Sequence, residues 1–133
     1  MTVLVDSSVW IDHLRGDLTP AVHGLRGMLF DQSREVITAD LITLEVVRGC
    51  RTERDAARVQ AMLLRFPCAS LGGIDAALRA AALYRKLRAK GVTLAKTVDL
   101  LIASWCIHEG VALLHDDADF DAAEGWGLRV WRA

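Results

Sequence analysis

The sequence lacks a surplus of either charge and lacks any cysteine pattern that would define a structural class. Its 16 basic and 17 acidic residues leave a net charge of −1, so no overall positive field indicates nucleic acid, and such a partner must be argued from local groups. The three cysteines are odd in number, widely spaced and without a Cys-x-x-Cys pair. This argues against a disulfide framework or a structural zinc site and predicts buried free thiols in a reducing compartment.

A long hydrophobic run and a secretory leader are missing as well. No apolar stretch approaches the roughly 18 residues that a membrane span needs, and the N-terminus has no basic start before it reaches Asp6. We therefore expect a cytoplasmic protein without membrane contact. The 133 residues are 53% hydrophobic and 25% charged, with no linker, repeat or low-complexity tract, which predicts a single globular domain over residues 1–133.

What the sequence does contain is an alternation of short apolar segments with longer amphipathic ones. Strands are expected where short apolar runs occur, at residues 3–5, 35–39, 111–114 and 128–131. Helices are expected from apolar spacing and capping residues, at residues 9–16, 20–30, 41–49, 52–66, 75–90 and 97–109. Strands that alternate with helices predict an α/β fold, a three-layer sandwich whose mostly parallel central sheet is flanked by helices.

Acidic residues gather where the expected strands end. Parallel strands end at a common edge of the sheet, and the active sites of open α/β folds lie beyond that edge. The acids are Asp6 after the first strand, Glu45 a turn or two beyond the second, Asp116, Asp117 and Asp119 after the third, and Asp99 near the start of the helix that leads to the third. Separate segments thus supply carboxylates that the fold can bring together.

Two of these acids stand among apolar neighbours, which indicates a neutralising partner. Glu45 and Asp99 are flanked by Leu and Val residues, and a carboxylate turned toward the sheet costs several kcal/mol unless something neutralises it. Clustered carboxylates also repel one another. A divalent cation removes both problems, and oxygen-only ligands suit Mg²⁺ or Mn²⁺. Since waters held by such ions can attack and stabilise phosphodiesters, the pattern favours a metal-dependent phosphodiester hydrolase.

Each acid also has a purely structural interpretation. Asp6 could simply cap the first helix, and Asp99 could face the helix dipole from the first turn. Glu45 could pair with Arg48, three residues further on, and the acids after the third strand could form a solvated loop. Their joint placement at strand ends is what favours a functional site.

Polar and basic residues near these acids are candidate substrate contacts. The candidates are Ser7, Arg48, Arg51 and His115. Arg51 begins a stripe of arginines on one helix face, and such a stripe can hold phosphates, although a solvated helix face is the alternative. Ser7 could hold a metal-bound water or the Asp6 carboxylate, or serve only as a helix-start hydroxyl.

Four segments, taken in order, resemble the PIN-domain toxins of the VapC family. They are VLVDSSVWI at residues 3–11, Glu45 with the Val46 and Arg48 that follow it, TVDLLIA at 97–103 and LLHDDADF at 113–120. By this resemblance the catalytic, metal-binding acids are Asp6, Glu45, Asp99 and Asp117, with Asp119 as an auxiliary ligand. The doublet at 116–117 leaves the fourth acid open by one position. Ser8 and His115 depart from the Asn and the Thr or Ser that many relatives carry.

The resemblance also implies an activity and partners. It implies a Mg²⁺- or Mn²⁺-dependent endoribonuclease that cleaves structured RNA such as tRNA or rRNA, acting as the toxin of a type II toxin–antitoxin system. It further implies a VapB-like antitoxin and a homodimer. The alternatives are a non-cleaving RNA- or protein-binding module and a structure-directed DNA nuclease. A phosphatase with Asp6 as nucleophile would need a second acid where Ser8 stands.

Overall fold

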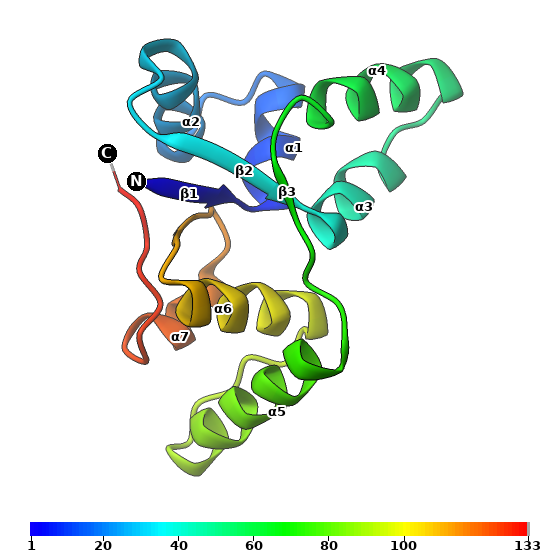
Figure 1. The fold of residues 1–133 in the computed structure, drawn as a ribbon. Coiled ribbons are helices and arrows are strands. Elements are labelled where there is room, and N and C mark those ends of the chain that lie inside the picture. Colours follow the sequence, from blue (N-terminus) through cyan, green and yellow to red (C-terminus); the bar gives the residue numbers. More distant parts are fainter. Residues whose placement is uncertain (133) are drawn as a thin grey trace.

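The computed structural model describes residues 1–132 and contains a parallel sheet between two helical layers (Figure 1). The strands are β1 (Thr2–Val5), β2 (Glu35–Ala39), β3 (Cys68–Ala69) and β4 (Ala112–Leu114). Their order across the sheet is β3-β2-β1-β4, and all the paired strands in residues 1–132 run parallel. Leu4 of β1 is in register with Ile37 on one side and Leu113 on the other. The predicted α/β class is confirmed.

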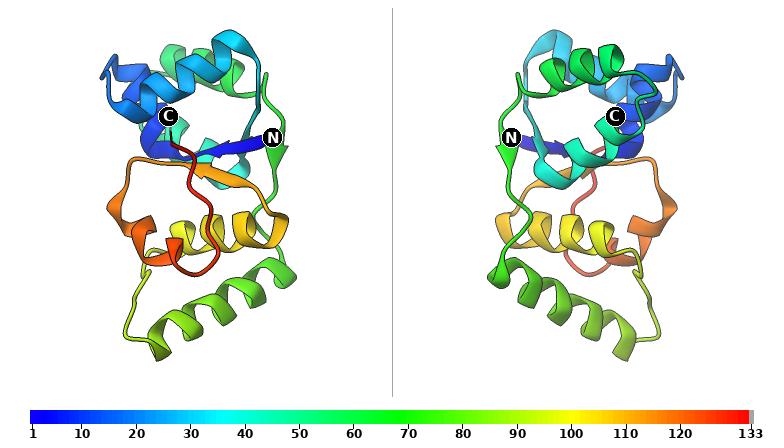
Figure 2. Two further views of the ribbon diagram at one scale, coloured as in Figure 1. Left: turned by 90° about the vertical axis from the view of Figure 1, so that its left-hand side faces the viewer. Right: turned by 90° about the vertical axis from the view of Figure 1, so that its right-hand side faces the viewer.

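Helices connect the strands and cover both faces of the sheet. They are α1 (Ser7–Arg15), α2 (Pro20–Asp31), α3 (Asp40–Arg48), α4 (Glu53–Leu63), α5 (Ile74–Ala89), α6 (Thr97–Glu109) and α7 (Asp121–Glu124), with a 3₁₀ turn, η1, at Ala118–Phe120. Figures 1 and 2 show α1, α2 and α4 on one face, and α6 and α7 on the other. Helix α5 packs on the outside of α6 rather than on the sheet.

Local sequence signals account for several helix ends. Thr52 caps α4 because its hydroxyl accepts a hydrogen bond from the Asp55 amide at 3.0 Å. Gly16 ends α1, and Gly110 ends α6, each with a left-handed backbone (φ 81° and 66°) that glycine adopts at little cost. The turn at Gly110 leads the chain from α6 into β4, which begins two residues later.

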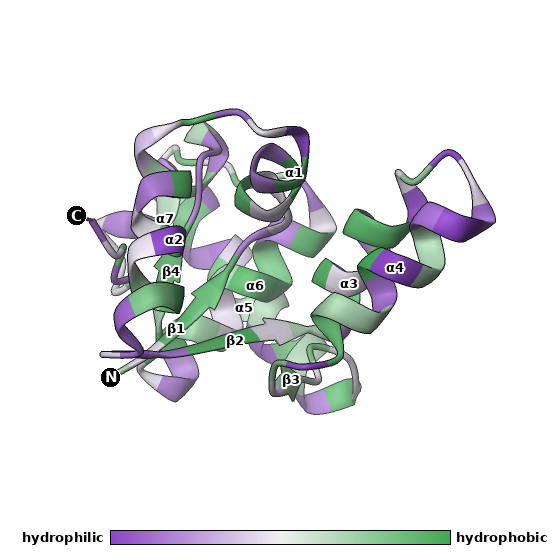
Figure 3. Cartoon of the chain, turned by 90° about the horizontal axis from the view of Figure 1, so that it is seen from above, coloured by the Kyte–Doolittle hydropathy of each residue, from purple (hydrophilic) through white to green (hydrophobic). Residues whose placement is uncertain are grey.

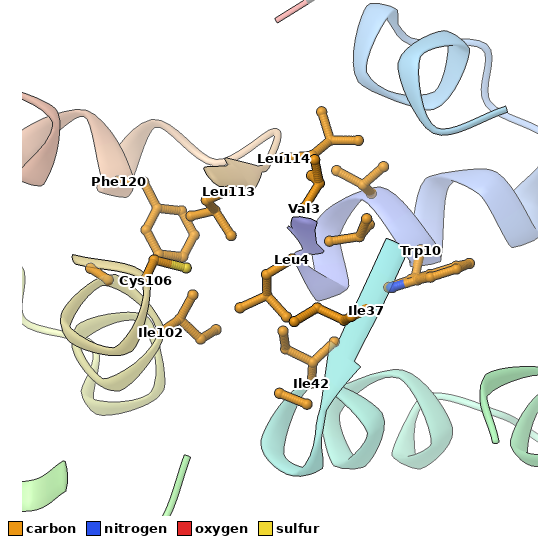
Figure 4. Packing of buried hydrophobic residues seen from close by; sticks show 14 of the residues in the cluster. Val3, Leu4, Trp10, Ile37, Ile42, Ile102, Cys106, Leu113, Leu114 and Phe120 are labelled. Atoms are coloured by element: carbon orange, nitrogen blue, oxygen red, sulfur yellow. The ribbon is translucent and has the colours of Figure 1, made fainter. Parts of the chain in front are cut away.

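The core surrounds the central strand. Residues 3–5 of β1 are fully buried, as expected for a strand flanked on both sides and covered on both faces. Ile102, Cys106 and Phe120 gather on one side of β1, and Trp10 lies on the other (Figure 4). Hydrophobic residues follow β1, β2, β4 and α6, whereas hydrophilic residues mark the outer turns of α2 and α4 (Figure 3).

The cysteines only partly match the expectation of buried thiols. All three are free, but only Cys106 is buried, Cys50 is half-buried and Cys68 is exposed. Cys68 is exposed because it lies in a two-residue strand at the edge of the sheet. Burial raises the pKa of the Cys106 thiol to about 12, so this group is a packing residue rather than a nucleophile.

Three local expectations need correction. The segment 128–131 is not a full strand, since a single parallel bridge joins Val130 to Leu113. Strand β3 was not expected, because two residues carry no alternation signal. The acidic segment after β4 forms η1 and α7, for which no helix was expected and a solvated loop was one interpretation. Among residues 1–132, no helix is long and apolar enough to cross a membrane.

Candidate active site

Asp6 stands at the carboxyl end of β1 with its two carboxylate oxygens in different environments. Oδ2 accepts hydrogen bonds from the Ser8 hydroxyl at 2.6 Å and the Ser8 amide at 3.2 Å, so it caps α1. Oδ1 is buried and has no hydrogen-bond partner among the described residues. Burial raises the pKa of Asp6, although the hydrogen bonds from Ser8 act in the opposite direction. Asp6 can therefore cap α1 and also bind a ligand, because Oδ2 makes the cap while Oδ1 has no partner in residues 1–132.

Asp99 presents a second buried and unpartnered oxygen. It lies in the first turn of α6 with 6% of its surface exposed, and its Oδ2 has no hydrogen-bond partner within residues 1–132. Burial, followed by the negative charges of Asp6 and Asp117, raises the pKa of Asp99 to about 7. The negative charge of Glu45 also raises the pKa of Asp99. The other three acids are therefore all close enough to Asp99 to affect its ionisation.

The loop after β4 completes a three-acid cluster. One carboxylate oxygen each from Asp99, Asp117 and Asp119 lies within 4.8 Å of the others. Asp117 also accepts a hydrogen bond from the Asp119 amide at 2.9 Å, which fixes the turn η1. Asp116 is exposed and is not a member of this cluster. The geometry therefore favours Asp117 over Asp116 as the fourth acid.

Glu45 is carried by α3, the helix that follows β2. Its Oε1 accepts a hydrogen bond from the Ser7 hydroxyl at 3.1 Å. Among the ion pairs found in residues 1–132, none joins Glu45 to Arg48. The structural interpretation of Glu45 as a helix-surface partner of Arg48 is therefore not supported. The Ser7 hydroxyl therefore orients Glu45, whereas the Ser7 backbone amide acts on Asp6 and lowers the pKa of that carboxyl.

The other predicted substrate contacts differ in exposure. Arg48 and Arg51 are exposed near the end of α3, beyond Glu45. His115 is turned inward: its Nδ1 accepts a hydrogen bond from the Asp117 amide at 3.2 Å, and its ring packs 5.0 Å from that of Phe120. His115 Nε2 is buried without a partner in the described chain. His115 thus supports the acidic loop, and its contact with a substrate stays a prediction.

The sequence analysis missed one charged residue of the site, Lys96. Its Nζ lies 3.0 Å from Asp119 Oδ2 and 3.9 Å from Asp117 Oδ2. One sequence feature could have identified Lys96 as a site residue. It is a lysine at the start of a helix, where an uncharged or acidic capping residue is normally favoured.

This donor set fits a divalent cation. The ligand atoms are carboxylate oxygens, and hard cations such as Mg²⁺, Mn²⁺ and Ca²⁺ prefer oxygen. The unpartnered oxygens of Asp6 and Asp99 are buried, and a buried polar atom without a partner destabilises the fold unless a ligand satisfies it. Lys96 is the one cation paired with these acids among the ion pairs of residues 1–132, and it leaves Asp6 and Asp99 without an ion-pair partner.

A parallel α/β sheet with a cluster of acidic side chains at its edge defines the class of this protein. The chain belongs to the PIN domain family, whose sequence model matches residues 3–125. This confirms the resemblance expected from the four segments.

Named relatives and solved structures agree with this assignment. Ribonuclease VapC11 of Mycobacterium tuberculosis is 26% identical over 119 residues, which cover 90% of this chain and 89% of the relative. VapBC2 from Rickettsia felis, solved bound to a DNA fragment from its promoter, is similar with a TM-score of 0.74 at 15% identity, over 98% of both chains. VapC20 of M. tuberculosis, described as a Sarcin-Ricin loop cleaving toxin, has a TM-score of 0.70 at 22% identity, over 98% of this chain and 99% of VapC20. These structures confirm the fold.

Proposed function

We propose that this protein is a metal-dependent endoribonuclease that acts as the toxin of a type II toxin–antitoxin system. The observation that carries the proposal is a pair of buried oxygens without a hydrogen-bond partner in residues 1–132, Asp6 Oδ1 and Asp99 Oδ2. They accompany the cluster of Asp99, Asp117 and Asp119. A protein that only binds RNA gains nothing from concentrated negative charge, because RNA phosphates are themselves negative. Similarity to a named ribonuclease over 90% of the chain adds support.

We assign two roles to the acids: some would bind the metal, and Glu45 would accept a proton from the attacking water. Asp6, Asp99 and Asp117 would hold Mg²⁺ or Mn²⁺, with Glu45 and Asp119 at the margin of the site. When bound, the ion supplies a polarised water and neutralises charge on the phosphate. Glu45, whose Oε1 is held by Ser7, keeps Oε2 available to accept a proton from that water. Hydrolysis by water would leave a 5′-phosphate and a 3′-hydroxyl.

Structured RNA, such as tRNA or rRNA, is the substrate class that we propose. Arg48 and Arg51 are exposed beyond Glu45 and can neutralise phosphates on either side of the cut. RNA differs from DNA at its 2′-hydroxyl. Support for RNA comes from the ribonuclease names of the curated relatives and from the description of VapC20 as a toxin that cleaves the Sarcin-Ricin loop.

The proposed partners follow from the similar complexes. Structures of VapBC assemblies from R. felis, Haemophilus influenzae and Salmonella typhimurium resemble this chain over 98–99% of its length. We therefore include a VapB-like antitoxin in the proposal. We also propose a homodimer, which rests only on the resemblance to VapC toxins. The single domain over residues 1–133 and the cytoplasmic location remain predictions of the sequence.

Cleavage of total cellular RNA by the purified protein tests the proposal. Wild-type protein should give discrete cuts with Mg²⁺ or Mn²⁺, and EDTA should abolish them. Asp6→Asn keeps a good helix cap and Asp99→Asn keeps the side-chain shape, yet both should reduce cleavage by at least about a hundredfold, since each removes a ligand charge. The matched control is Asp75→Asn, an exposed acid in the first turn of α5, which should cut like wild type.

The result also separates the alternatives. RNA binding without cuts, in folded protein free of antitoxin, would contradict the nuclease and indicate a binding module. Metal-dependent cuts in DNA but not in RNA would indicate a DNA nuclease.

A further inference from the structure

Lys96 occupies an unusual position for a basic residue. It is the N-cap of α6 and makes no capping hydrogen bond with its side chain. Ser, Thr, Asp and Asn are preferred at this position, and a positive charge there opposes the helix dipole. The Nζ atom instead reaches Asp119 Oδ2 at 3.0 Å and Asp117 Oδ2 at 3.9 Å. Lys96 is thus a poor choice for the start of its own helix. Its ion pairs with the acids of the site account for a lysine at this position.

The use of lysine rather than arginine is informative in this chain. Only three of its 16 basic residues are lysines, at positions 86, 90 and 96. The planar arginine guanidinium can donate two parallel hydrogen bonds to a carboxylate. The lysine ammonium is instead a compact, hydrated charge on a flexible side chain. The side chains of Lys96 and Asp119 are 66% and 47% exposed, and exposed ion pairs are weak. The contact is therefore easily made and released.

We propose that Lys96 is the internal counter-cation of this site: it holds Asp117 and Asp119 in the metal-free protein and releases both when a divalent cation binds. This inference rests on the proposed metal site. Asp117 and Asp119 each place an oxygen within 4.8 Å of one from Asp99, so the ammonium group and a divalent ion share ligands. Two cations on the same carboxylates repel each other, so Lys96 lowers the affinity for metal while it orders the loop without metal.

Calorimetric titration of Mn²⁺ into Lys96 variants tests the competition. Lys96→Met removes the competing cation and should bind Mn²⁺ roughly three- to tenfold more tightly, which matches the loss of two weak ion pairs, one exposed and one half-buried. Lys96→Arg should bind Mn²⁺ more weakly than wild type, because a bidentate guanidinium is harder to displace. Lys90→Met is the matched control, an exposed lysine at the C-cap of α5, and should match wild type.

Release of the ammonium group can be observed directly by NMR. Reductive methylation with ¹³C-formaldehyde keeps the charge and labels the three lysines and the N-terminus. The Lys96 signal, identified by its loss in Lys96→Arg, should shift on addition of Mg²⁺ until the site is saturated. The signals of Lys86 and Lys90 should stay in place.

Two outcomes would overturn this inference alone, and a third would overturn the proposed metal site as well. Mn²⁺ binding in Lys96→Met that equals or falls below wild type would contradict competition, and an unmoved Lys96 signal in metal-loaded protein would contradict release. Absence of metal binding in every protein, wild type included, would overturn the proposed metal site and this inference with it.

Discussion

At the scale of single residues, Ser8 connects the first acid of the site to the loop that carries the last ones. Its hydroxyl donates to Asp6 Oδ2 at 2.6 Å and accepts from the Asp116 amide at 3.2 Å. One small side chain thus fixes the rotation of the Asp6 carboxylate and the start of the loop after β4. This double contact shows how Ser8 can serve at the position where the resemblance to VapC toxins led us to expect Asn.

We therefore predict that Ser8→Ala weakens metal binding without unfolding the protein. Groups that orient metal ligands through hydrogen bonds typically change metal affinity by about 10- to 100-fold, and we expect at least about a tenfold loss in a Mn²⁺ titration. Ser8→Asn should restore most of the affinity, because its amide can also donate to Asp6 and accept from the chain.

The chain contains a matched control for Ser8. Ser33 donates to Asp31 Oδ1 through its hydroxyl at 2.7 Å and its amide at 2.9 Å, in the same two-residue arrangement but on the exposed surface. Ser33→Ala should leave Mn²⁺ binding unchanged. An equal loss of affinity in Ser8→Ala and Ser33→Ala would show that the effect is not specific to the site.

At the scale of elements, helix α2 shows how the C-terminal segment is held. Trp131 packs so closely on Gly24 that a Cβ atom at position 24 would lie 2.4 Å from Cζ3 of the indole. Arg34 also stands over the Trp131 ring, with its Cζ 5.5 Å from the ring centroid. The parallel bridge between Leu113 and Val130 lies beside this contact in the sequence. The close packing of Trp131 on α2 therefore requires glycine at position 24.

Two glycines of the same helix should respond in opposite ways to alanine. Gly24→Ala should lower the free energy of unfolding by about 1–3 kcal/mol, since the new methyl group forces Trp131 to move. Gly27→Ala meets no atom of the described residues within 4 Å and should raise the free energy of unfolding by roughly 0.5–1 kcal/mol, because alanine favours helix. Urea unfolding, followed by tryptophan fluorescence, measures both. Equal stability of the two variants would contradict the proposed contact.

Much of the secondary structure could be predicted from the sequence, because its signals are local. The caps Thr19 and Thr52 and the terminal glycines 16 and 110 mark helix ends within one turn of the chain. Strand β3 could not be predicted, since a two-residue strand is defined by its pairing with β2 and not by its own residues. The stacking of α5 on α6 likewise depends on tertiary packing.

The candidate site was predictable in its residue types but not in its contacts. Four acids were expected to converge because parallel strands end at one edge. The unpartnered Oδ1 of Asp6 and Oδ2 of Asp99, and the pairing of Lys96 with Asp119, depend on side-chain placement between segments far apart in the sequence. No local pattern encodes such contacts. Whether the four acids bind metal stays a prediction.

At the scale of the whole molecule, the concentration of acids in one place links stability to pH. Burial and the charges of Asp6 and Asp117 raise the pKa of Asp99 to about 7, and burial also raises that of Asp6. In the unfolded chain these carboxyls titrate near about pH 4. Between about pH 4 and about pH 7 the unfolded chain therefore releases protons that the folded protein keeps, so the free energy of unfolding falls as pH rises.

We predict that the metal-free protein is less stable at about pH 8 than at about pH 5, and that Mg²⁺ removes much of this difference. Each unit by which the pKa of Asp99 is raised destabilises the fold by about 1.4 kcal/mol once both states are ionised. Asp99→Asn, which cannot ionise, should flatten the dependence, whereas the exposed control Asp75→Asn should keep it. Urea unfolding in EDTA and in excess Mg²⁺ measures these slopes. A metal-free wild type whose stability rises from pH 5 to pH 8 would contradict the prediction, because its buried carboxyls would then be no more difficult to ionise than those of the unfolded chain.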